Sequence, residues 1–212
     1  MLGEIIVGGK RWPVAAPVRT WIDTGFHFVG RLRTDTRWIV NHWTGAENSA
    51  AQCFVNMRAR KVSVHFICDQ LGEIYQCADA DTRLAHAQEN GGNTFGVGIE
   101  IVNRGHDFTV PARSFDRPRR TETIHGRPVT YGEFFPAQVA SVIALNTALC
   151  KAYGLPLRCP VKNGAVYATV LPLRYLSTYT GCLGHMNLDA GKPDPGLDLL
   201  EKIHAAGLPV VT

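Results

Sequence analysis

The sequence lacks several patterns that would assign it to a common class of protein. None of its six cysteines stands in a Cys-x-x-Cys pair, which argues against a zinc ribbon and a thioredoxin-like redox site. No apolar run reaches the ~18 residues that a membrane-spanning helix needs. The N-terminus has no charged segment followed by a long apolar one, so we expect synthesis in the cytoplasm without a signal peptide. Internal repeats and low-complexity tracts are also missing.

Charge is scarce as well. Charged residues make up 19% of the chain and the formal net charge is only +4, which is weaker than the basic stripe of a typical nucleic-acid-binding protein. Hydrophobic residues make up 45% of the 212 positions, enough for one domain with a sizeable core. We therefore expect no nucleic-acid partner, and we expect the cysteines to be mostly reduced thiols in the core. They stand at positions 53, 68, 77, 150, 159 and 182.

Hydrophobic periodicity predicts a sheet covered by helices. The strand patterns are 37–45, ending at His42, a hairpin over 62–79, and 95–103. The helical patterns are a short one after Ser49, one from Pro136 to Gly154, and a last one over 197–207. Strands interleaved with helices in this way predict an α/β or α+β fold with a central mixed sheet in a single domain.

Two segments fall outside this pattern. Residues 1–36 are expected to form a β-rich extension of unassigned role that precedes a main domain over 37–212. Residues 104–135 turn to Arg, Pro and Thr, which predicts a long irregular insertion rather than a linker.

Candidate chemical groups lie at strand ends and in one late loop. Glu100 lies on a strand face otherwise occupied by glycines, and the loop "GHMNLDAGKPDPG" carries His185 and Asp194. A catalytic zinc needs three His or carboxylate ligands and one open position, which His42, His185 and Asp194 could supply. Each also has a plain alternative, namely a hydrogen-bonded structural histidine or a surface turn.

Five segments in order resemble a known family. "VNHWTG", "VSVHFICDQLGEIYQ", "AHA", "NTFGVGIEIVN" and "GHMNLDAGKPDPG" are similar to segments of zinc-dependent N-acetylmuramoyl-L-alanine amidases of the amidase-2 or peptidoglycan-recognition-protein class, over about residues 37–200. The resemblance implies hydrolysis of the amide between N-acetylmuramic acid and L-alanine in peptidoglycan. It implies Zn²⁺ as the cofactor, held by His42, His185 and Asp194.

The same resemblance assigns further roles. It implies that Glu100 is the catalytic proton carrier and that Lys192 stabilises the developing oxyanion. His86 and Asn93 become candidates for substrate binding. Four histidines lie outside the motifs and are expected to be dispensable for metal binding, namely His27, His106, His125 and His204.

The chain departs from the family pattern at three points. Asn41 and Trp43 flank the first ligand, where the family has paired histidines or a Ser or Thr pattern. Val64 stands where some phage members have a catalytic Tyr, so Glu100 must carry more of the chemistry. "AHAQ" replaces the family's "WHAG", which leaves a structural role for His86 as an equal alternative. His65 alternates with core positions, so we expect it to be packed or hydrogen-bonded.

The biological setting is open between alternatives. The N-terminal extension and the insertion make the chain longer than a minimal peptidoglycan-recycling enzyme. This favours a phage-type endolysin that acts on the wall after release. A cytoplasmic recycling amidase, a non-catalytic peptidoglycan-binding protein of the same fold, and an additional role in binding a host protein remain alternatives. The sequence does not fix the oligomeric state.

Overall fold

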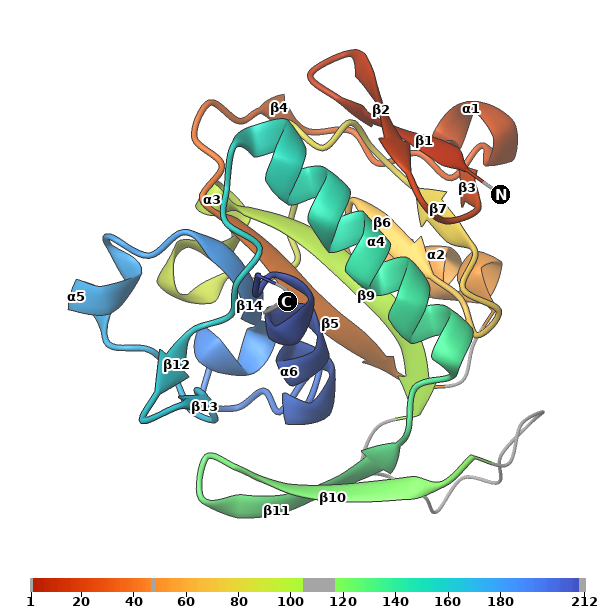
Figure 1. Ribbon diagram of the computed structural model, residues 1–212. Coiled ribbons are helices and arrows are strands. Elements are labelled where there is room, and N and C mark those ends of the chain that lie inside the picture. The colour runs from red at the N-terminus through yellow and green to blue at the C-terminus, as the bar shows by residue number, and fades with distance from the viewer. Residues whose placement is uncertain (1, 47–48, 105–116, 210–212) are drawn as a thin grey trace.

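A six-stranded mixed sheet forms the centre of the protein (Figure 1). The computed structural model describes residues 2–46, 49–104 and 117–209. Strands β14, β5, β9 and β6 run parallel, β7 is antiparallel to β6, and β3 pairs with β7 in parallel. The sheet order is β14 (Gly181–Gly184), β5 (Trp38–Gly45), β9 (Gly96–Arg104), β6 (Phe66–Cys68), β7 (Ile74–Gln76) and β3 (Val18–Arg19). The predicted mixed sheet in a single domain is confirmed.

Helices cover both faces of the sheet. Alternation along β9 directs Val97, Ile99 and Ile101 into one core with α4 (Pro136–Tyr153), while Val102 packs on the other side with α2 (Ala50–Ala59). In Figure 1, α4 crosses the front of the sheet and α2 lies behind it. The predicted helix is confirmed, because Pro136 occupies its first turn and Gly154 ends it with φ of 66°.

The remaining elements are short, apart from α6. Ser49 caps α2 by accepting a hydrogen bond from the Gln52 amide at 3.2 Å, as the sequence predicts. The other helices are α1 (Trp21–Thr24), η1 (Glu89–Gly91), α3 (Gly92–Phe95), α5 (Leu173–Leu176), η2 (His185–Asn187) and α6 (Leu197–Ala206). The strands outside the main sheet pair as β1 (Gly3–Val7) with β2 (Lys10–Val14), β4 (Arg31–Leu32) with β8 (Thr82–Arg83), β10 (Arg119–Ile124) with β11 (Arg127–Gly132), and β12 (Val161–Lys162) with β13 (Ala165–Val166).

Strand boundaries differ from the predicted ones. The hairpin predicted over 62–79 is present, but its strands are only three residues each. The first strand does not end at His42, because β9 offers β5 a pairing partner as far as Gly45. Phe95 belongs to α3 rather than to β9, which begins at Gly96.

The N-terminal residues are built into the same core. Ile5 and Val14, from the β1–β2 hairpin, are 0% and 1% exposed and pack in the cluster beneath α4. β3 forms the edge of the main sheet. Arg33 is buried and donates hydrogen bonds to the carbonyl oxygens of Gly96 and Ala80, which ties this segment to the start of β9.

The insertion contains regular structure where the sequence predicted none. Residues 119–132 form the antiparallel β10–β11 hairpin, while residues 105–116 lie outside the described part of the chain. The two turn residues, His125 and Gly126, have φ of 53° and 73°, the conformation typical of two-residue hairpins. The prediction was wrong here because β10 reads "RRTETI", in which polar residues occupy both faces and hide the strand period.

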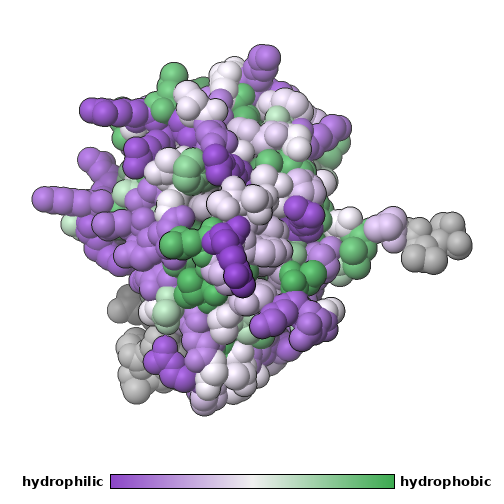
Figure 2. Space-filling model, turned by 90° about the vertical axis from the view of Figure 1, so that its left-hand side faces the viewer, coloured by the Kyte–Doolittle hydropathy of each residue, from purple (hydrophilic) through white to green (hydrophobic). Residues whose placement is uncertain are grey.

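The cysteines lie in the core, and the described helices include none that could span a membrane. All six cysteines are free and buried, which confirms the predicted core thiols. On the face drawn in Figure 2, hydrophobic residues form small patches among hydrophilic ones. Within the described residues, no helix has the length and hydropathy of a membrane span.

A buried amide pair joins α4 to the strand that carries His42. Asn146 Nδ2 donates to the side-chain oxygen Oδ1 of Asn41 at 3.0 Å, and Asn41 Nδ2 donates back to Asn146 Oδ1 at 3.2 Å. Both side chains are fully buried, so water cannot replace either partner. The pair therefore fixes the position of β5 next to its first candidate ligand.

We expect Asn146→Ala to lower the free energy of unfolding by about 1–3 kcal/mol, because it leaves the buried side-chain oxygen of Asn41 without its donor. Urea unfolding in the presence of a chelator measures this without a contribution from metal binding. The control is Thr147→Ala on the exposed side of the same helix, with an expected change within about 0.5 kcal/mol. Equal effects of the two variants would contradict the role of the pair.

Candidate active site

Parallel pairing brings two candidate residues to neighbouring strands. His42 on β5 lies opposite Glu100 on β9, so both side chains project from the sheet face away from α4. On the other side of β5, β14 pairs only as far as Gly184 opposite Asn41, and His185 follows directly. The end of β14 thus places His185 beside His42.

The late loop returns to this point and adds Asp194. The Met186 amide donates to the Asp194 carbonyl oxygen at 3.0 Å, which holds the end of the loop against its beginning. A Cβ at Gly184 would lie 2.7 Å from the Pro195 ring, so only glycine permits this approach. Loop closure therefore directs the Asp194 carboxylate toward both histidines.

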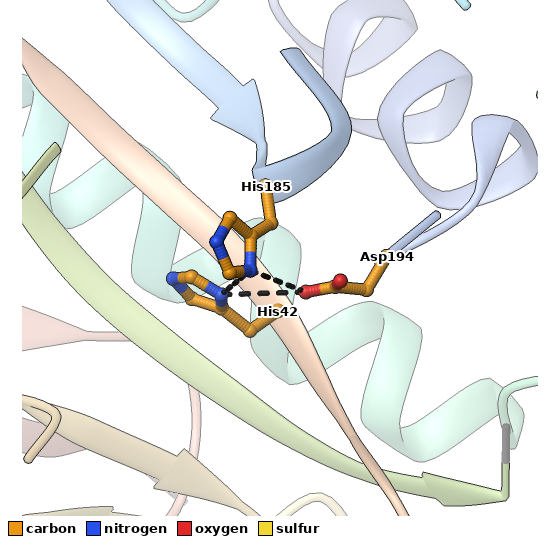
Figure 3. Close-up of side chains that lie close together, drawn as sticks. All are labelled: His42, His185 and Asp194. Carbon is orange, nitrogen blue, oxygen red and sulfur yellow. Dashed lines mark hydrogen bonds and ion pairs between the residues drawn. The ribbon is translucent and has the colours of Figure 1, made fainter. Parts of the chain in front are cut away.

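Three ligand atoms converge, as Figure 3 shows. The Nδ1 atoms of His42 and His185 are 3.0 Å apart, and Asp194 Oδ2 lies 3.3 Å and 3.2 Å from them. All three residues are buried. Two imidazole nitrogens and one carboxylate oxygen are the donor set of a catalytic zinc site with one open position. The residues that the sequence singled out as ligands are thus brought together by the structure.

Burial sets the charge of this cluster. Burial and the neighbouring His185 lower the pKa of His42 to about 4, so its imidazole is neutral near pH 7. Burial alone would raise the pKa of Asp194, but the adjacent His185, followed by His42, holds it well below its ordinary value. A neutral imidazole and an ionised carboxylate are the forms that coordinate a cation.

His86 connects the candidate ligand His42 to the backbone of β9. Its Nε2 lies 3.0 Å from the Gly96 carbonyl oxygen, which can only accept, so Nε2 carries the proton and Nδ1 is an acceptor. His42 Nε2 lies 3.1 Å from that Nδ1 and must therefore donate to it. This leaves the His42 Nδ1 lone pair directed at His185 and Asp194. Both nitrogens of His86 are occupied within the protein, so its predicted role in substrate binding stays a prediction.

Gly98 of β9 makes room for this histidine. A Cβ at Gly98 would lie 2.7 Å from His86 Cγ, whereas one at Gly96 would be blocked mainly by the Gly92 carbonyl oxygen at 2.6 Å. The sequence correctly placed Glu100 on a glycine-bearing face, but the cleared space holds His86. Burial, followed by the proximity of His42 and His65, lowers the pKa of His86 well below its ordinary value.

A cleft of about 590 Å³ opens over the three candidate ligand residues. Glu100 and Lys192 line it, and the Glu100 carboxylate makes no hydrogen bond to the described part of the chain. Burial and the negative charge of Asp194 raise the pKa of Glu100 to about 8. The structure thus gathers both predicted catalytic residues at the ligand cluster, while their roles stay predictions.

Asn93 also lines the cleft, beside the turn that carries His86. Its side-chain oxygen accepts hydrogen bonds from the amides of His86 and Ala87 at 2.8 Å and 2.7 Å. The oxygen therefore holds this turn in place, and only its amide group remains for a substrate. The substrate-binding role of Asn93 stays a prediction.

The other described histidines make contacts within the fold, and the contact of His125 is one that the sequence did not predict. His65 is fully buried and bonds to the Thr82 carbonyl oxygen and the Gly98 amide, which confirms that it is packed. His204 accepts a hydrogen bond from the Cys159 amide, and His27 stacks on Trp21. His106 lies outside the described residues. His125 contacts the Lys192 backbone, which sequence reasoning missed because no local pattern links a hairpin turn to a distant loop.

Solved structures with a similar fold include a phage enzyme and two bacterial proteins. The Ph2119 endolysin of the Thermus scotoductus MAT2119 bacteriophage Ph2119 has a TM-score of 0.53 at 17% identity, over 88% of this chain and 99% of that one. AmpDH3 of Pseudomonas aeruginosa has a TM-score of 0.54 at 17% identity, over 87% of this chain and 64% of that one. The Staphylococcus aureus hydrolase AmiA, in complex with its ligand, has a TM-score of 0.54 at 14% identity, over 91% and 83%. At these identities the likeness shows the fold.

The sequence itself carries the family assignment. A comparison with curated proteins finds no match. The family model described as N-acetylmuramoyl-L-alanine amidase matches residues 32–197, which is most of the chain and includes every candidate site residue. The chain therefore belongs to the N-acetylmuramoyl-L-alanine amidase family.

Proposed function

We propose that this chain is a zinc-dependent hydrolase that cleaves the amide bond between N-acetylmuramic acid and L-alanine in peptidoglycan. One observation carries the proposal: His42, His185 and Asp194 direct three ligand atoms to one point in the cleft that Glu100 and Lys192 also line. Family membership supplies the substrate class. A complete donor set also favours an enzyme over a non-catalytic binding protein of the same fold.

Zinc fits this donor set. Tetrahedral zinc accepts two imidazole nitrogens and one carboxylate oxygen, and it leaves a fourth position for water. His42 enters the site neutral, with its Nδ1 lone pair directed by the bond between its Nε2 and His86. When bound, zinc lowers the pKa of a coordinated water to ~7 and polarises a carbonyl group.

Glu100 is placed to move the proton. Its carboxylate lies on the strand next to His42, and no hydrogen bond within the described residues restrains it. A cation at the ligand site would lower its raised pKa and keep it ionised as a base near neutral pH. Glu100 then takes the proton of the attacking water and returns it to the leaving amine nitrogen.

Lys192 supplies a positive charge at the same cleft. It lies two residues before Asp194 on the closed loop, and its side chain lines the cleft. An ammonium group near the carbonyl carbon that is attacked stabilises the negative charge on its oxygen. Its exposed position lets substrate reach it directly.

We further propose a phage-type endolysin as the setting, with a recycling amidase as the alternative. The proposed catalytic domain, residues 37–212, contains an insertion that exceeds what a minimal recycling enzyme needs, and the β10–β11 hairpin lies within this insertion. The Ph2119 endolysin, similar in fold, comes from a bacteriophage. The two settings differ in whether the substrate is intact wall or soluble fragments.

Digestion of purified peptidoglycan should release peptides with a new L-alanine amino terminus and no new reducing sugar. Mass analysis of the products and a reducing-sugar assay measure these two outcomes, and 1,10-phenanthroline should abolish cleavage until Zn²⁺ is restored. Faster turnover of intact sacculi than of soluble muropeptides supports an endolysin, and the reverse supports recycling. New reducing ends without L-alanine termini would contradict the proposed reaction.

Glu100→Gln should lower kcat about 100-fold or more and leave zinc content unchanged, because the amide cannot accept the proton. The matched control is Glu89→Gln, an exposed carboxylate of the same cleft, which should keep kcat within about two-fold. Turnover of a soluble muropeptide and metal analysis of both proteins give the comparison. A Glu100→Gln protein with parental kcat would remove Glu100 from the mechanism.

A further inference from the structure

Helix α6 begins three residues after Asp194 without a cap of its own. The residue before it is Gly196, which has φ of 91° and no side chain to accept hydrogen bonds. The first amides of a helix need acceptors from outside its own backbone ladder. The start of α6, and with it the end of the ligand-bearing loop, therefore depends on another element.

Glu122 on β10 provides these acceptors. Its two carboxylate oxygens accept hydrogen bonds from the amides of Leu197 and Asp198, at 2.6 Å and 2.9 Å. A carboxylate is favoured at this end of a helix by the positive end of the helix dipole. Charge-assisted bonds of this kind are stronger than neutral ones, so this contact joins the inserted hairpin firmly to α6.

The hairpin meets the same loop at two further points. A Cβ at Gly196 would lie 2.5 Å from the Tyr131 hydroxyl, so the Tyr131 ring fills the space beside this glycine. At the hairpin turn, His125 Nε2 donates to the Lys192 carbonyl oxygen at 3.0 Å. Figure 1 shows the hairpin extended below α6. These contacts fall on both sides of Asp194 along the chain.

We propose that Glu122 is a positioning residue for the metal ligand Asp194. In this proposal the β10–β11 hairpin acts as a clamp that holds residues 192–198, and with them Asp194, in place. The loop is held from inside by the bond between the Met186 amide and the Asp194 carbonyl oxygen, and from outside by the hairpin. Release of the outer contact would let Asp194 Oδ2 move away from His42 and His185. This inference rests on the proposed zinc site.

The role differs from simple stabilisation of the fold. A clamp sets the geometry of the bound metal and its affinity, whereas a helix cap alone would change only resistance to unfolding. The affinity of the purified protein for Zn²⁺ and the visible spectrum of its Co²⁺ form report the ligand geometry. The melting temperature of the metal-free protein reports the fold.

The test compares Glu122→Ala and Glu122→Gln with a control on the same insertion. Glu133→Gln is the control, because within the described residues this carboxylate pairs with Arg120 and makes no direct hydrogen bond or ion pair to residues 192–198. We expect Glu122→Ala to raise the Kd for Zn²⁺ about 10-fold, the lower range for residues that support metal ligands, and to change the Co²⁺ spectrum. Glu122→Gln keeps one acceptor oxygen, so its Kd should rise about three-fold, and Glu133→Gln should match the parent.

A folded Glu122→Ala protein with parental Kd and Co²⁺ spectrum would overturn the inference, even if its melting temperature fell. If Glu122→Ala does not fold, an unchanged Kd for Glu122→Gln overturns it in the same way. A parent protein that binds no Zn²⁺ would contradict the proposed function and this inference together. Zinc binding by the parent with no effect of Glu122 would contradict this inference alone.

Discussion

The register of three parallel strands determines where chemistry can occur in this protein. Pairing of β5 with β9 sets His42 beside Glu100, and pairing with β14 ends one residue earlier, so His185 turns toward the same point. A shift of one residue in either pairing would direct these side chains to the opposite face. The buried bond between Asn41 and Asn146 secures this register from the α4 side.

Desolvation then gives each group its chemical form. Burial disfavours charge, so His42 and His86 are neutral, and Asp194 stays ionised only because His185 and His42 lie beside it. Glu100 has no such partner within the described residues, and its pKa is raised. The cluster therefore carries a negative charge that a divalent cation would neutralise, and Glu100 remains available for its proposed role as the proton carrier.

Sequence reasoning reached the parts that depend on local pattern. α4 follows from a helical period between Pro136 and Gly154, and β9 from strict alternation. The candidate ligands His42 and Asp194 are far apart in the sequence, so residue chemistry could only offer them with His185 as a possible set, and the family resemblance supported that set. Their convergence is a product of strand order, which local pattern does not encode.

The parts that sequence reasoning missed depend on contacts between distant side chains. Nothing in "AHA" tells that His86 fixes the proton of His42, because this follows from which acceptor faces each ring nitrogen. The polar hairpin residue Glu122 has the same limitation, since its partners are backbone amides 75 and 76 positions later. Such supports become visible only when the fold is known.

The central claim is that His42, His185 and Asp194 hold a catalytic zinc. The most direct test is a crystal structure of the protein purified without added chelator, with diffraction data collected on both sides of the zinc absorption edge. The account predicts one anomalous peak that appears only above the edge, about 2.0–2.2 Å from His42 Nδ1, His185 Nδ1 and Asp194 Oδ2. A zinc peak elsewhere, or a fully active protein without one at this point, would contradict it.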